Sequence, residues 1–405
     1  MFAQDKTVNI GIVAEYNPFH NGHAWQIARA RDEYAKACII AVMSGNFVQR
    51  GQPAILDKWQ RAQVAVDSGV DLVLELPFSF ACRSAEHFAR GSIGILNALG
   101  IVDRLVFGAE CPDIRELQTI AAHSLQPHFV GKLKEYMKSG LSYPQALQSV
   151  LSTDNIRTAT IDSPNNILAV EYLKQLMLIN SSIQPQMIVR HAAGYKDTTI
   201  TGPIASATAI RKQLSVDVYT ATQALPQSAA NTIELAQISG QLVFEDDEHL
   251  SLLCIYRLRS LTPEYLRTHT DVSEGLEYSI LKNAALHNNL TDLLASLVNK
   301  RYTHSRISRI IMQALVGMYK AEHPTYIRPL AFSRRGRVAL GQIKSHATLP
   351  LIAKLGRNLV NLPIALQQCP ILQTEINSGN IYQLLLANVS GVHNLDFFKS
   401  PYFKN

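Results

Sequence analysis

The sequence predicts an α/β protein with a Rossmann-like, doubly wound parallel sheet, followed by a mainly α-helical C-terminal domain. Apolar runs alternate with amphipathic segments through the first half of the chain. The runs are nearly continuous, which is typical of strands that are covered on both faces. After about residue 220 the periodicity becomes mostly helical. A chain of 405 residues is long for one core, and we expect two domains, residues 1–220 and 221–405.

Each expected strand is a short apolar run followed by a turn and then by a segment of helical periodicity. The expected strands are residues 8–13, 37–43, 70–76, 104–108 and 185–190. The expected helices are residues 24–36, 57–68, 85–99, 165–179, 229–238, 249–260, 274–287, 290–298 and 305–318. Parallel strands bring their carboxyl ends to one edge of the sheet, so the turns after them should converge there. These turns are residues 20–23, 44–53, 77–80 and 108–110.

Composition excludes several classes of protein. The hydrophobic fraction of 47% is sufficient for a packed globular protein. There is no uncharged apolar stretch of about 18 residues, so we expect no membrane span. Residues 1–9 are too short and too polar for a signal peptide. The five cysteines are isolated and none has C-x-x-C spacing, which predicts reduced cysteines in a cytoplasmic protein without a zinc site.

The first turn of the expected rim has the sequence His20-Asn21-Gly22-His23. Gly22 permits a ligand to approach the backbone closely. A helix that begins here directs unpaired N–H groups and a partial positive charge at the rim, which suits a phosphate. The two histidines could donate hydrogen bonds to a phosphate oxygen whose charge grows during attack at phosphorus. The alternatives are histidines that only cap the helix and a metal site, for which no third ligand is evident.

This motif resembles the H-x-G-H signature of the nucleotidyltransferase superfamily, whose fold is a Rossmann-like HUP domain. Longer stretches resemble the bacterial tRNA(Met) cytidine acetate ligase family. They are VAEYNPFHNGH (13–23), MSGNFVQRG (43–51), SGVDLVLELP (68–77), FGAE (107–110), SPNNIL (163–168) and ASATAIR (205–211). The resemblance covers most of the chain and weakens after about residue 360.

The resemblance implies an ATP-dependent ligase. Acetate would attack the α-phosphorus of ATP to give acetyl-adenylate and pyrophosphate. The N4 atom of the wobble cytidine in elongator tRNA(Met) would then take the acetyl group, giving N4-acetylcytidine. Acetate is already a nucleophile, so no catalytic serine or cysteine is required. The loop 44–53 could shield the reactive anhydride from water. Magnesium is expected with ATP, although the sequence shows no dedicated protein site for it.

The resemblance also assigns roles to individual residues, with His20 and His23 as the catalytic pair. The expected ATP-binding residues are Val13, Ala14, Glu15, Tyr16, Asn17, Pro18, Phe19, His20, Asn21, Gly22, His23, Gln26, Gly108, Asn165, Asn166 and Arg190. One of the two asparagines should bind the nucleotide, or the pair only caps a helix. A second phosphate motif, S-x-T-x-x-R, consists of Ser206, Thr208 and Arg211, unless it too is only a cap.

Four residues near the turns have open roles. Lys58 could reach a phosphate or the acetate, or could be an ordinary surface lysine. Gln49 and Arg50 could contact the cytidine or close the pocket. Glu15 is expected to order the turn and not to act as a base.

The stretch 300–357 contains twelve lysines and arginines against one acid, Glu322. Cations interleaved with aromatic residues suit the phosphates and unstacked bases of a tRNA. The ordinary alternative is a solvated cationic face. The residues that we expect to bind tRNA are Lys300, Arg301, Arg306, Arg309, Arg334 and Arg335.

Two other functions compete with the acetate ligase. A coenzyme-type adenylyltransferase for a small phosphorylated substrate would explain the first domain but not the basic second half. An ATP-responsive RNA-binding protein would not need both histidines. A class I aminoacyl-tRNA synthetase is disfavoured because no K-M-S-K-S-like loop is present. The sequence does not distinguish acetate from another short carboxylate, since that depends on pocket volume, and it does not determine the oligomeric state.

Overall fold

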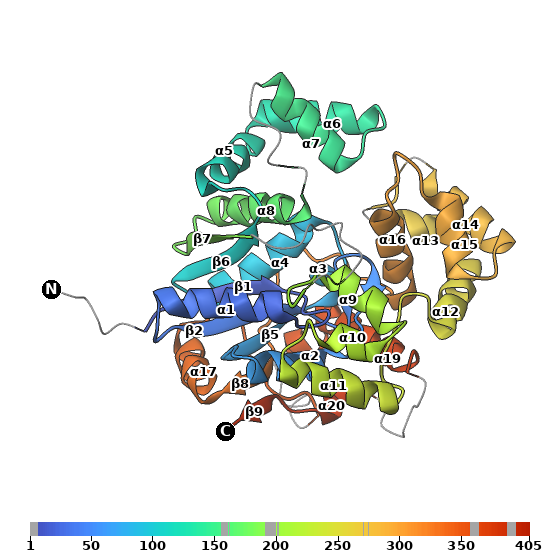
Figure 1. The fold of residues 1–405 in the computed structure, drawn as a ribbon. Helices are drawn as coiled ribbons and strands as arrows, with labels where there is room; N and C mark the ends of the chain where they lie inside the picture. Colours follow the sequence, from blue (N-terminus) through green and yellow to red (C-terminus); the bar gives the residue numbers. More distant parts are fainter. Residues whose placement is uncertain are drawn as a thin grey trace.

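The structure is a computed structural model that describes residues 7–154, 161, 163–190, 200, 202–269, 271–273, 275–356, 364–386 and 394–405. Its centre is a seven-stranded sheet of order β7-β6-β1-β2-β5-β8-β9 (Figure 1). The strands are β1 (Asn9–Ala14), β2 (Cys38–Ser44), β5 (Leu72–Leu76), β6 (Arg104–Ala109), β7 (Gln184–Val189), β8 (Pro329–Ser333) and β9 (Tyr402–Lys404). The first five are parallel to one another, which confirms the predicted doubly wound sheet.

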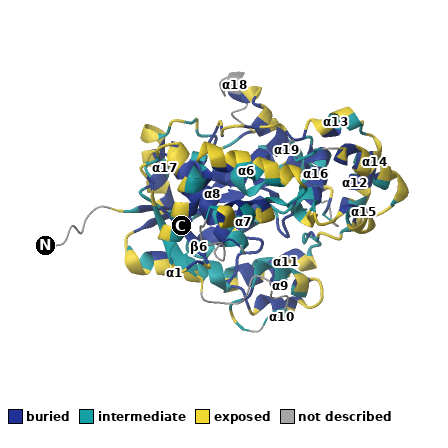
Figure 2. Ribbon diagram, turned by 90° about the horizontal axis from the view of Figure 1, so that it is seen from above, coloured by how far each residue is buried: buried dark blue, intermediate teal, exposed yellow. Residues whose placement is uncertain are grey.

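Helices cover both faces of the sheet, as the continuous apolar strands require. One face packs against α1 (Asn21–Glu33), α2 (Lys58–Asp67), α9 (Ala207–Leu214), α10 (Val218–Thr222) and α11 (Gln227–Ile238). The other packs against α4 (Ala85–Ala98), α8 (Pro164–Leu178) and α17 (Arg334–His346). On β2, Ile40 and Val42 enter the second of these cores, while Ile39 and Met43 enter the first. Figure 2 shows the buried residues concentrated in these layers.

A separate helical unit lies beside the sheet and has its own core (Figure 1). Its helices are α12 (Glu248–Arg259), α13 (Pro263–Arg267), α14 (Leu276–Leu286), α15 (Leu290–Leu297) and α16 (His304–Val316). The helices expected in this part of the chain are therefore confirmed. The core of the unit also takes in Phe47 and Phe78, which belong to the loops at the edge of the sheet.

The division expected at residue 220 does not follow the sheet. Strand β8 pairs antiparallel with β5, and β9 pairs with β8, so two strands of the sheet come from the expected C-terminal domain. Helix α17 packs against β2 and β5 as well. The C-terminal segment thus covers the edge of β5, and β9 becomes the edge strand of the sheet on this side. Strand β9 has three residues, and β8 begins with a proline and lies within the basic stretch, so neither gives the apolar run that predicted the other strands.

The remaining elements fill the periphery. They are the short hairpin β3 (Phe47–Val48) and β4 (Gln52–Pro53), and the helices α3 (Phe78–Ala81), α5 (Ile114–Ser124), α6 (Pro127–Lys138), α7 (Tyr143–Thr153), α18 (Ile364–Gln367), α19 (Pro370–Gln383) and α20 (Leu395–Phe398). None of the helices in the described ranges has the length and apolarity to cross a bilayer.

Candidate active site

A cleft opens at the carboxyl ends of β1 and β6, where the order of the strands reverses. This is the position at which doubly wound sheets bind ligands. The cleft has a volume of about 230 Å³. The predicted site residues that line it are Val13, Ala14, Glu15, Tyr16, Asn17, His20, His23, Gln26, Gly108, Asn165, Arg190, Ser206, Thr208 and Arg211. The fold thus brings the three separate motifs of the sequence to one cavity.

Some predicted ligand residues do not line the cleft. They are Pro18, Phe19, Asn21, Gly22 and Asn166. The side chain of Asn21 donates to the carbonyl of Pro203 at 2.8 Å, which attaches the start of α1 to the segment before α9. Asn166 is buried, and its Oδ1 accepts the N–H groups of Glu110 and Cys111 at 2.9 and 3.1 Å. It therefore shapes the turn after β6, and Asn165 is the asparagine of the pair that faces the cleft.

His20 and His23 form a reciprocal cap at the start of α1. The Nδ1 of His20 accepts the N–H of Gly22 at 3.1 Å, and the Nδ1 of His23 accepts the N–H of His20 at 3.2 Å. The two rings stack with centroids 3.7 Å apart. A neutral imidazole has one donor and one acceptor nitrogen, so these bonds place the proton of each ring on Nε2. Capping and a role toward a phosphate are thus compatible, because they use different nitrogens.

Both imidazoles are neutral in the folded protein. Burial, together with the positive charges of Arg190 and Arg211, lowers the pKa of His20 to about 3. Burial above all, and then the neighbouring His20 ring and the charge of Arg190, hold the pKa of His23 well below 6.5. The cleft therefore contains two neutral Nε2–H donors and at least two guanidinium groups, a combination that suits an anionic ligand.

The second motif also combines capping with a place in the cleft. Ser206 is the N-cap of α9, and its hydroxyl accepts the N–H of Ala209 at 3.0 Å. Arg211 donates to the main-chain carbonyl of Asn17 at 2.8 Å. That bond ties α9 to the turn before the histidine motif. Thr208 lines the same wall.

Position 108 favours glycine because the side chain of Arg190 passes close over it. A Cβ at this position would lie 3.3 Å from two carbons of the Arg190 side chain. The guanidinium of Arg190 approaches Glu110, whose carboxylate also accepts hydrogen bonds from Asn165 and Ser163. Gly108 thus makes room for a side chain of the cleft, in addition to lining the cleft itself.

The loop expected to shield the site is a hairpin that is already packed. The carboxylate of Glu15 accepts the N–H of Gln49 at 2.7 Å, which supports the expectation that Glu15 orders the turn. Gly51 has a φ of 77°, and a Cβ there would lie 2.3 Å from the backbone nitrogen of Arg309. The hairpin is therefore held between the cleft on one side and α16 on the other. Gln49 and Arg50 line the cleft.

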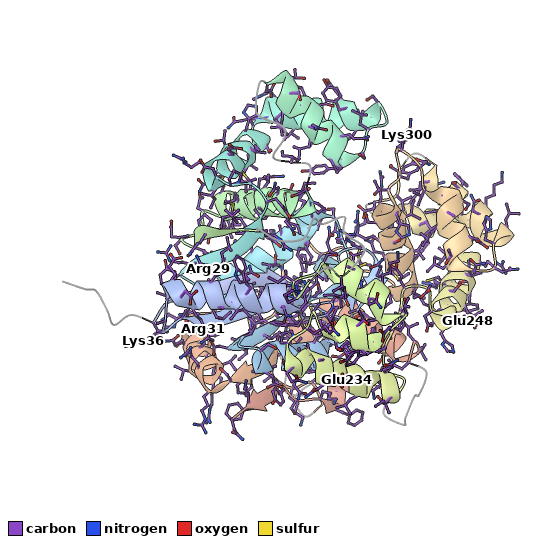
Figure 3. All side chains as sticks on the ribbon, in the orientation of Figure 1. Arg29, Arg31, Lys36, Glu234, Glu248 and Lys300 are labelled. Carbon is purple, nitrogen blue, oxygen red and sulfur yellow. The ribbon has the colours of Figure 1, made fainter. Side chains whose placement is uncertain are left out.

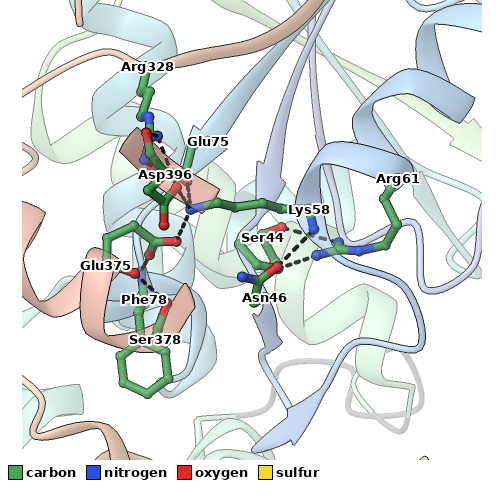
Figure 4. Close-up of polar contacts among 11 residues, drawn as sticks. Ser44, Asn46, Lys58, Arg61, Glu75, Phe78, Arg328, Glu375, Ser378 and Asp396 are labelled. Atoms are coloured by element: carbon green, nitrogen blue, oxygen red, sulfur yellow. Dashed lines mark hydrogen bonds and ion pairs between the residues drawn. The ribbon is translucent and has the colours of Figure 1, made fainter. Parts of the chain in front are cut away.

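Lys58 is neither a surface lysine nor a residue of the cleft, so both predictions for it are wrong. Its ammonium is fully buried and lies 2.6 Å from Glu75, 2.8 Å from Glu375 and 2.7 Å from Asp396 (Figure 4). Arg328, which the sequence placed in the basic stretch, joins the same cluster at 2.9 Å from Asp396. A buried cation requires such partners, and the sequence gives no sign of them.

Arg61, one turn after Lys58, was not predicted as a site residue. Its guanidinium is buried and donates to the carbonyls of Leu56, Glu15, Ser44 and Gly45, the last at a very short distance. Glu15 directly follows β1, Ser44 and Gly45 lie at the end of β2, and Leu56 lies just before α2. Arg61 therefore holds together the ends of the two central strands beside the cleft, and Figure 4 shows it beside Ser44 at the end of β2.

The basic stretch does not form one surface. Arg306 and Arg309 on α16 are anchored to Asp271: Arg306 donates to its carbonyl at 2.8 Å, and Arg309 lies 3.4 Å from its carboxylate. Helix α17, which begins with Arg334 and Arg335, lies on the opposite side of the molecule from α16 (Figure 1). Of the predicted tRNA-binding residues on the helical unit, Lys300 is exposed at its outer end (Figure 3). Arg357 lies outside the described residues.

Several further residues line the cleft that the sequence did not single out as ligands. They are Val48, Gln52, Phe88, Phe107, Glu110, Pro164, Leu168, Tyr172 and Ala207. Leu168 and Tyr172 lie four apart on α8, a spacing that equally indicates an ordinary core helix. Only their position beside the cleft in the folded protein distinguishes them from ordinary core residues.

Comparison with known proteins agrees with the geometry. A family described as HIGH Nucleotidyl Transferase matches residues 8–394. The tRNA(Met) cytidine acetate ligase of Alkaliphilus metalliredigens is 37% identical, with 98% of each chain covered. That of Acetivibrio thermocellus is 36% identical, over 94% of this chain and 95% of the relative.

Solved structures give the same result. The apo crystal structure of Thermotoga maritima TmcAL matches with a TM-score of 0.90 and 32% identity, covering 98% of this chain and 99% of that one. The form bound with alpha-thio ATP matches with a TM-score of 0.89 and 30% identity over the same shares. The chain therefore belongs to the tRNA(Met) cytidine acetate ligases, within the HIGH nucleotidyl transferase family.

Proposed function

We propose that this ligase joins acetate to ATP in the cleft between β1 and β6 and passes the acetyl group to N4 of the wobble cytidine of elongator tRNA(Met). The observation that carries the proposal is the pair His20 and His23, whose Nδ1 atoms are both occupied by main-chain N–H groups. Each ring thus has its Nε2–H free for a phosphate oxygen. No proton need leave these rings, because acetate attacks as its anion.

In the first step an acetate oxygen forms a bond to the α-phosphorus, and the bond to the bridging oxygen breaks, so that pyrophosphate leaves. His20 and His23 would stabilise the charge that grows on the α-phosphate. Arg190 and Arg211 would bind the phosphates electrostatically. Mg²⁺, which neutralises phosphate charge, would be held mainly by ATP itself. The cleft carboxylates Glu15 and Glu110 fit poorly as its ligands because each already accepts hydrogen bonds.

In the second step the cytidine N4 attacks the acetyl carbonyl carbon, AMP leaves, and N4 loses a proton. The exposed end of the helical unit is the surface that we propose for tRNA, with Lys300 and Arg301 in contact with phosphates. Arg301 also lies beside the ring of Tyr302 at 5.6 Å, and Arg306 lies beside the same ring at 5.2 Å. A cation and an aromatic ring together suit an unstacked base and its phosphate.

The two steps can be tested in one reaction that contains ATP, labelled acetate and bulk bacterial tRNA. We expect label in N4-acetylcytidine, dependent on ATP and lost in His20→Asn. Pyrophosphate release that requires a phosphorylated coenzyme precursor instead of acetate would favour a coenzyme adenylyltransferase. RNA binding without any pyrophosphate release would favour an ATP-responsive RNA-binding protein.

The tRNA surface needs its own test. Charge reversal of Lys300 and Arg301 should weaken tRNA binding and reduce its dependence on salt, while acetate-dependent pyrophosphate release stays unchanged. Arg335→Glu on α17 is the matched control, because Arg335 donates to the carbonyl of Ala37 far from this surface. Equal weakening by the control would remove the helical unit as the principal tRNA surface.

A further inference from the structure

Two histidines and an aspartate meet outside the cleft, where α5, α6 and α7 form a layer beyond α8 (Figure 1). His123 lies in the last turn of α5, His128 in the first turn of α6, and Asp154 is the residue at which α7 ends. The Nε2 of His123 is 2.9 Å from Oδ2 of Asp154, and the Nε2 of His128 is 3.6 Å from the same oxygen. One candidate ligand atom of each residue lies within 4.8 Å of those of the other two.

We propose that His123, His128 and Asp154 form a structural Zn²⁺ site that joins the three helices. Two imidazole nitrogens and one carboxylate oxygen are a ligand set that zinc accepts, with water in the fourth position. Zinc bonds these atoms at about 2.0–2.2 Å in a tetrahedron, which places its ligands about 3.3–3.5 Å apart. The two distances to Asp154 lie on either side of this value, so small side-chain rotations would admit the ion. The metal would bind the Nε2 lone pair of His123, and the ring proton that now lies toward Asp154 would move to Nδ1.

Lys132 prepares the carboxylate for this role. Its ammonium lies 2.6 Å from Oδ1 of Asp154, which leaves Oδ2 facing the two imidazoles. The contacts of Asp154 with Lys132 at 2.6 Å and with His123 at 2.9 Å together fix the orientation of the carboxylate. Partners that orient a metal ligand in this way are common around zinc sites. The positive charge of Lys132 should also limit the affinity, because it repels the ion.

The packing of α6 supplies an independent reason for a metal at this place. The helix has 12 residues, but Phe129 is its only fully buried side chain. Figure 2 shows the outer side of α6 exposed along its length. Apolar packing therefore holds α6 weakly, and structural metals are one means by which units with little core are stabilised. A zinc ion would attach the start of α6 to the ends of α5 and α7.

The test uses the full-length protein, freed of metal with a chelator that is then removed. ZnCl₂ is added in a calorimetric titration, and CoCl₂ in a titration followed by visible absorption. We expect one saturable site for each ion, Co²⁺ bands typical of a tetrahedral site, and a higher thermal midpoint with zinc. His128 is more than half exposed, so His128→Ala should fold normally and lower the zinc affinity at least about tenfold. Lys132→Gln should raise it.

His249→Ala is the matched control. His249 is also exposed and lies 3.4 Å from an aspartate, Asp247, but the described residues offer no third ligand there. It should leave zinc binding unchanged. The proposal is overturned if the wild-type protein shows no saturable site, or if His123→Ala and His128→Ala bind zinc as tightly as the wild type.

Discussion

The Nδ1 atom of His23 accepts the backbone N–H of His20 at 3.2 Å, so one histidine caps the other inside the helix turn that forms the cleft. The Nδ1 of His20 is occupied in the same way by Gly22. Each side chain therefore has two separable functions, one structural through Nδ1 and one chemical through Nε2.

Substitutions can separate these functions. Asparagine is a favourable N-cap, and glutamine at the third helical position completes a capping box, but neither places a donor where Nε2 lies. His20→Asn and His23→Gln should each lower kcat for acetyl-adenylate formation about 10²–10³-fold, with little change in the thermal midpoint. His20→Ala should lose activity and also about 1 kcal/mol of stability. Kinetics and thermal unfolding of the three variants would measure this. Retained activity in His20→Asn would show that the histidine only caps.

The buried histidines should make the protein sensitive to acid. Burial lowers the pKa of His20 to about 3, and those of His87 and His269 to about 4. The unfolded chain, with histidine pKa values near 6.5, then binds more protons than the folded chain below that pH. The contribution of these residues to the free energy of unfolding is complete above about pH 6.5 and declines as the pH falls toward about 3. Urea unfolding between about pH 7 and pH 5 should show a smaller decline in His20→Asn than in the wild type. An identical decline would show that His20 does not titrate as its burial requires.

Arg61 should influence the reaction through the position of the strand ends. Lysine keeps the charge but cannot reach four carbonyls at once. Arg61→Lys should raise KM for ATP and lower kcat/KM by on the order of tenfold to a hundredfold, because small displacements near reacting groups are costly. Arg83→Lys is the control: Arg83 is equally buried and donates to the carbonyl of Ala321, away from the cleft. If both variants lose stability and activity in parallel, Arg61 supports the fold in general and not the cleft.

The buried cluster around Lys58 should be essential for stability and not for chemistry. Lys58→Met leaves the carboxylates of Glu75, Glu375 and Asp396 buried without their shared cation. We expect the free energy of unfolding to fall by about 3–5 kcal/mol. Adding Glu375→Gln should restore part of it, because Arg328 still pairs with Asp396 and Glu75, whereas Glu375 has no second cation among the described residues. Chemical denaturation of both variants measures the effect, and Lys344→Met, on the exposed side of α17, should change it little. No difference between Lys58→Met and Lys344→Met would contradict a role for the cluster.

The sequence by itself determined the parallel strands, many helices of both halves and the turn that carries His20 and His23, whereas α5, α6, α7, α17 and α19 were not predicted. These features depend on the period of apolar residues and on motifs whose members are close in the chain, so the local sequence is sufficient to predict them. The choice between Asn165 and Asn166 was different. Both occupy the first turn of one helix, so the sequence alone does not separate them. The position of β6 does: Asn166 accepts the N–H groups of Glu110 and Cys111, and Asn165 faces the cleft.

Only the tertiary structure decided which charged side chains are buried and which partners they have. Lys58 and Glu375 are 317 positions apart, and Arg328 stands among surface-like cations in the sequence, yet all three share one buried cluster. Arg306 and Arg309 are held by Asp271, while α17 carries Arg334 and Arg335 to another side. A charge has no periodicity that reveals its partner. Its environment is set by which distant segments the folded sheet and its returning C-terminal strands bring beside it.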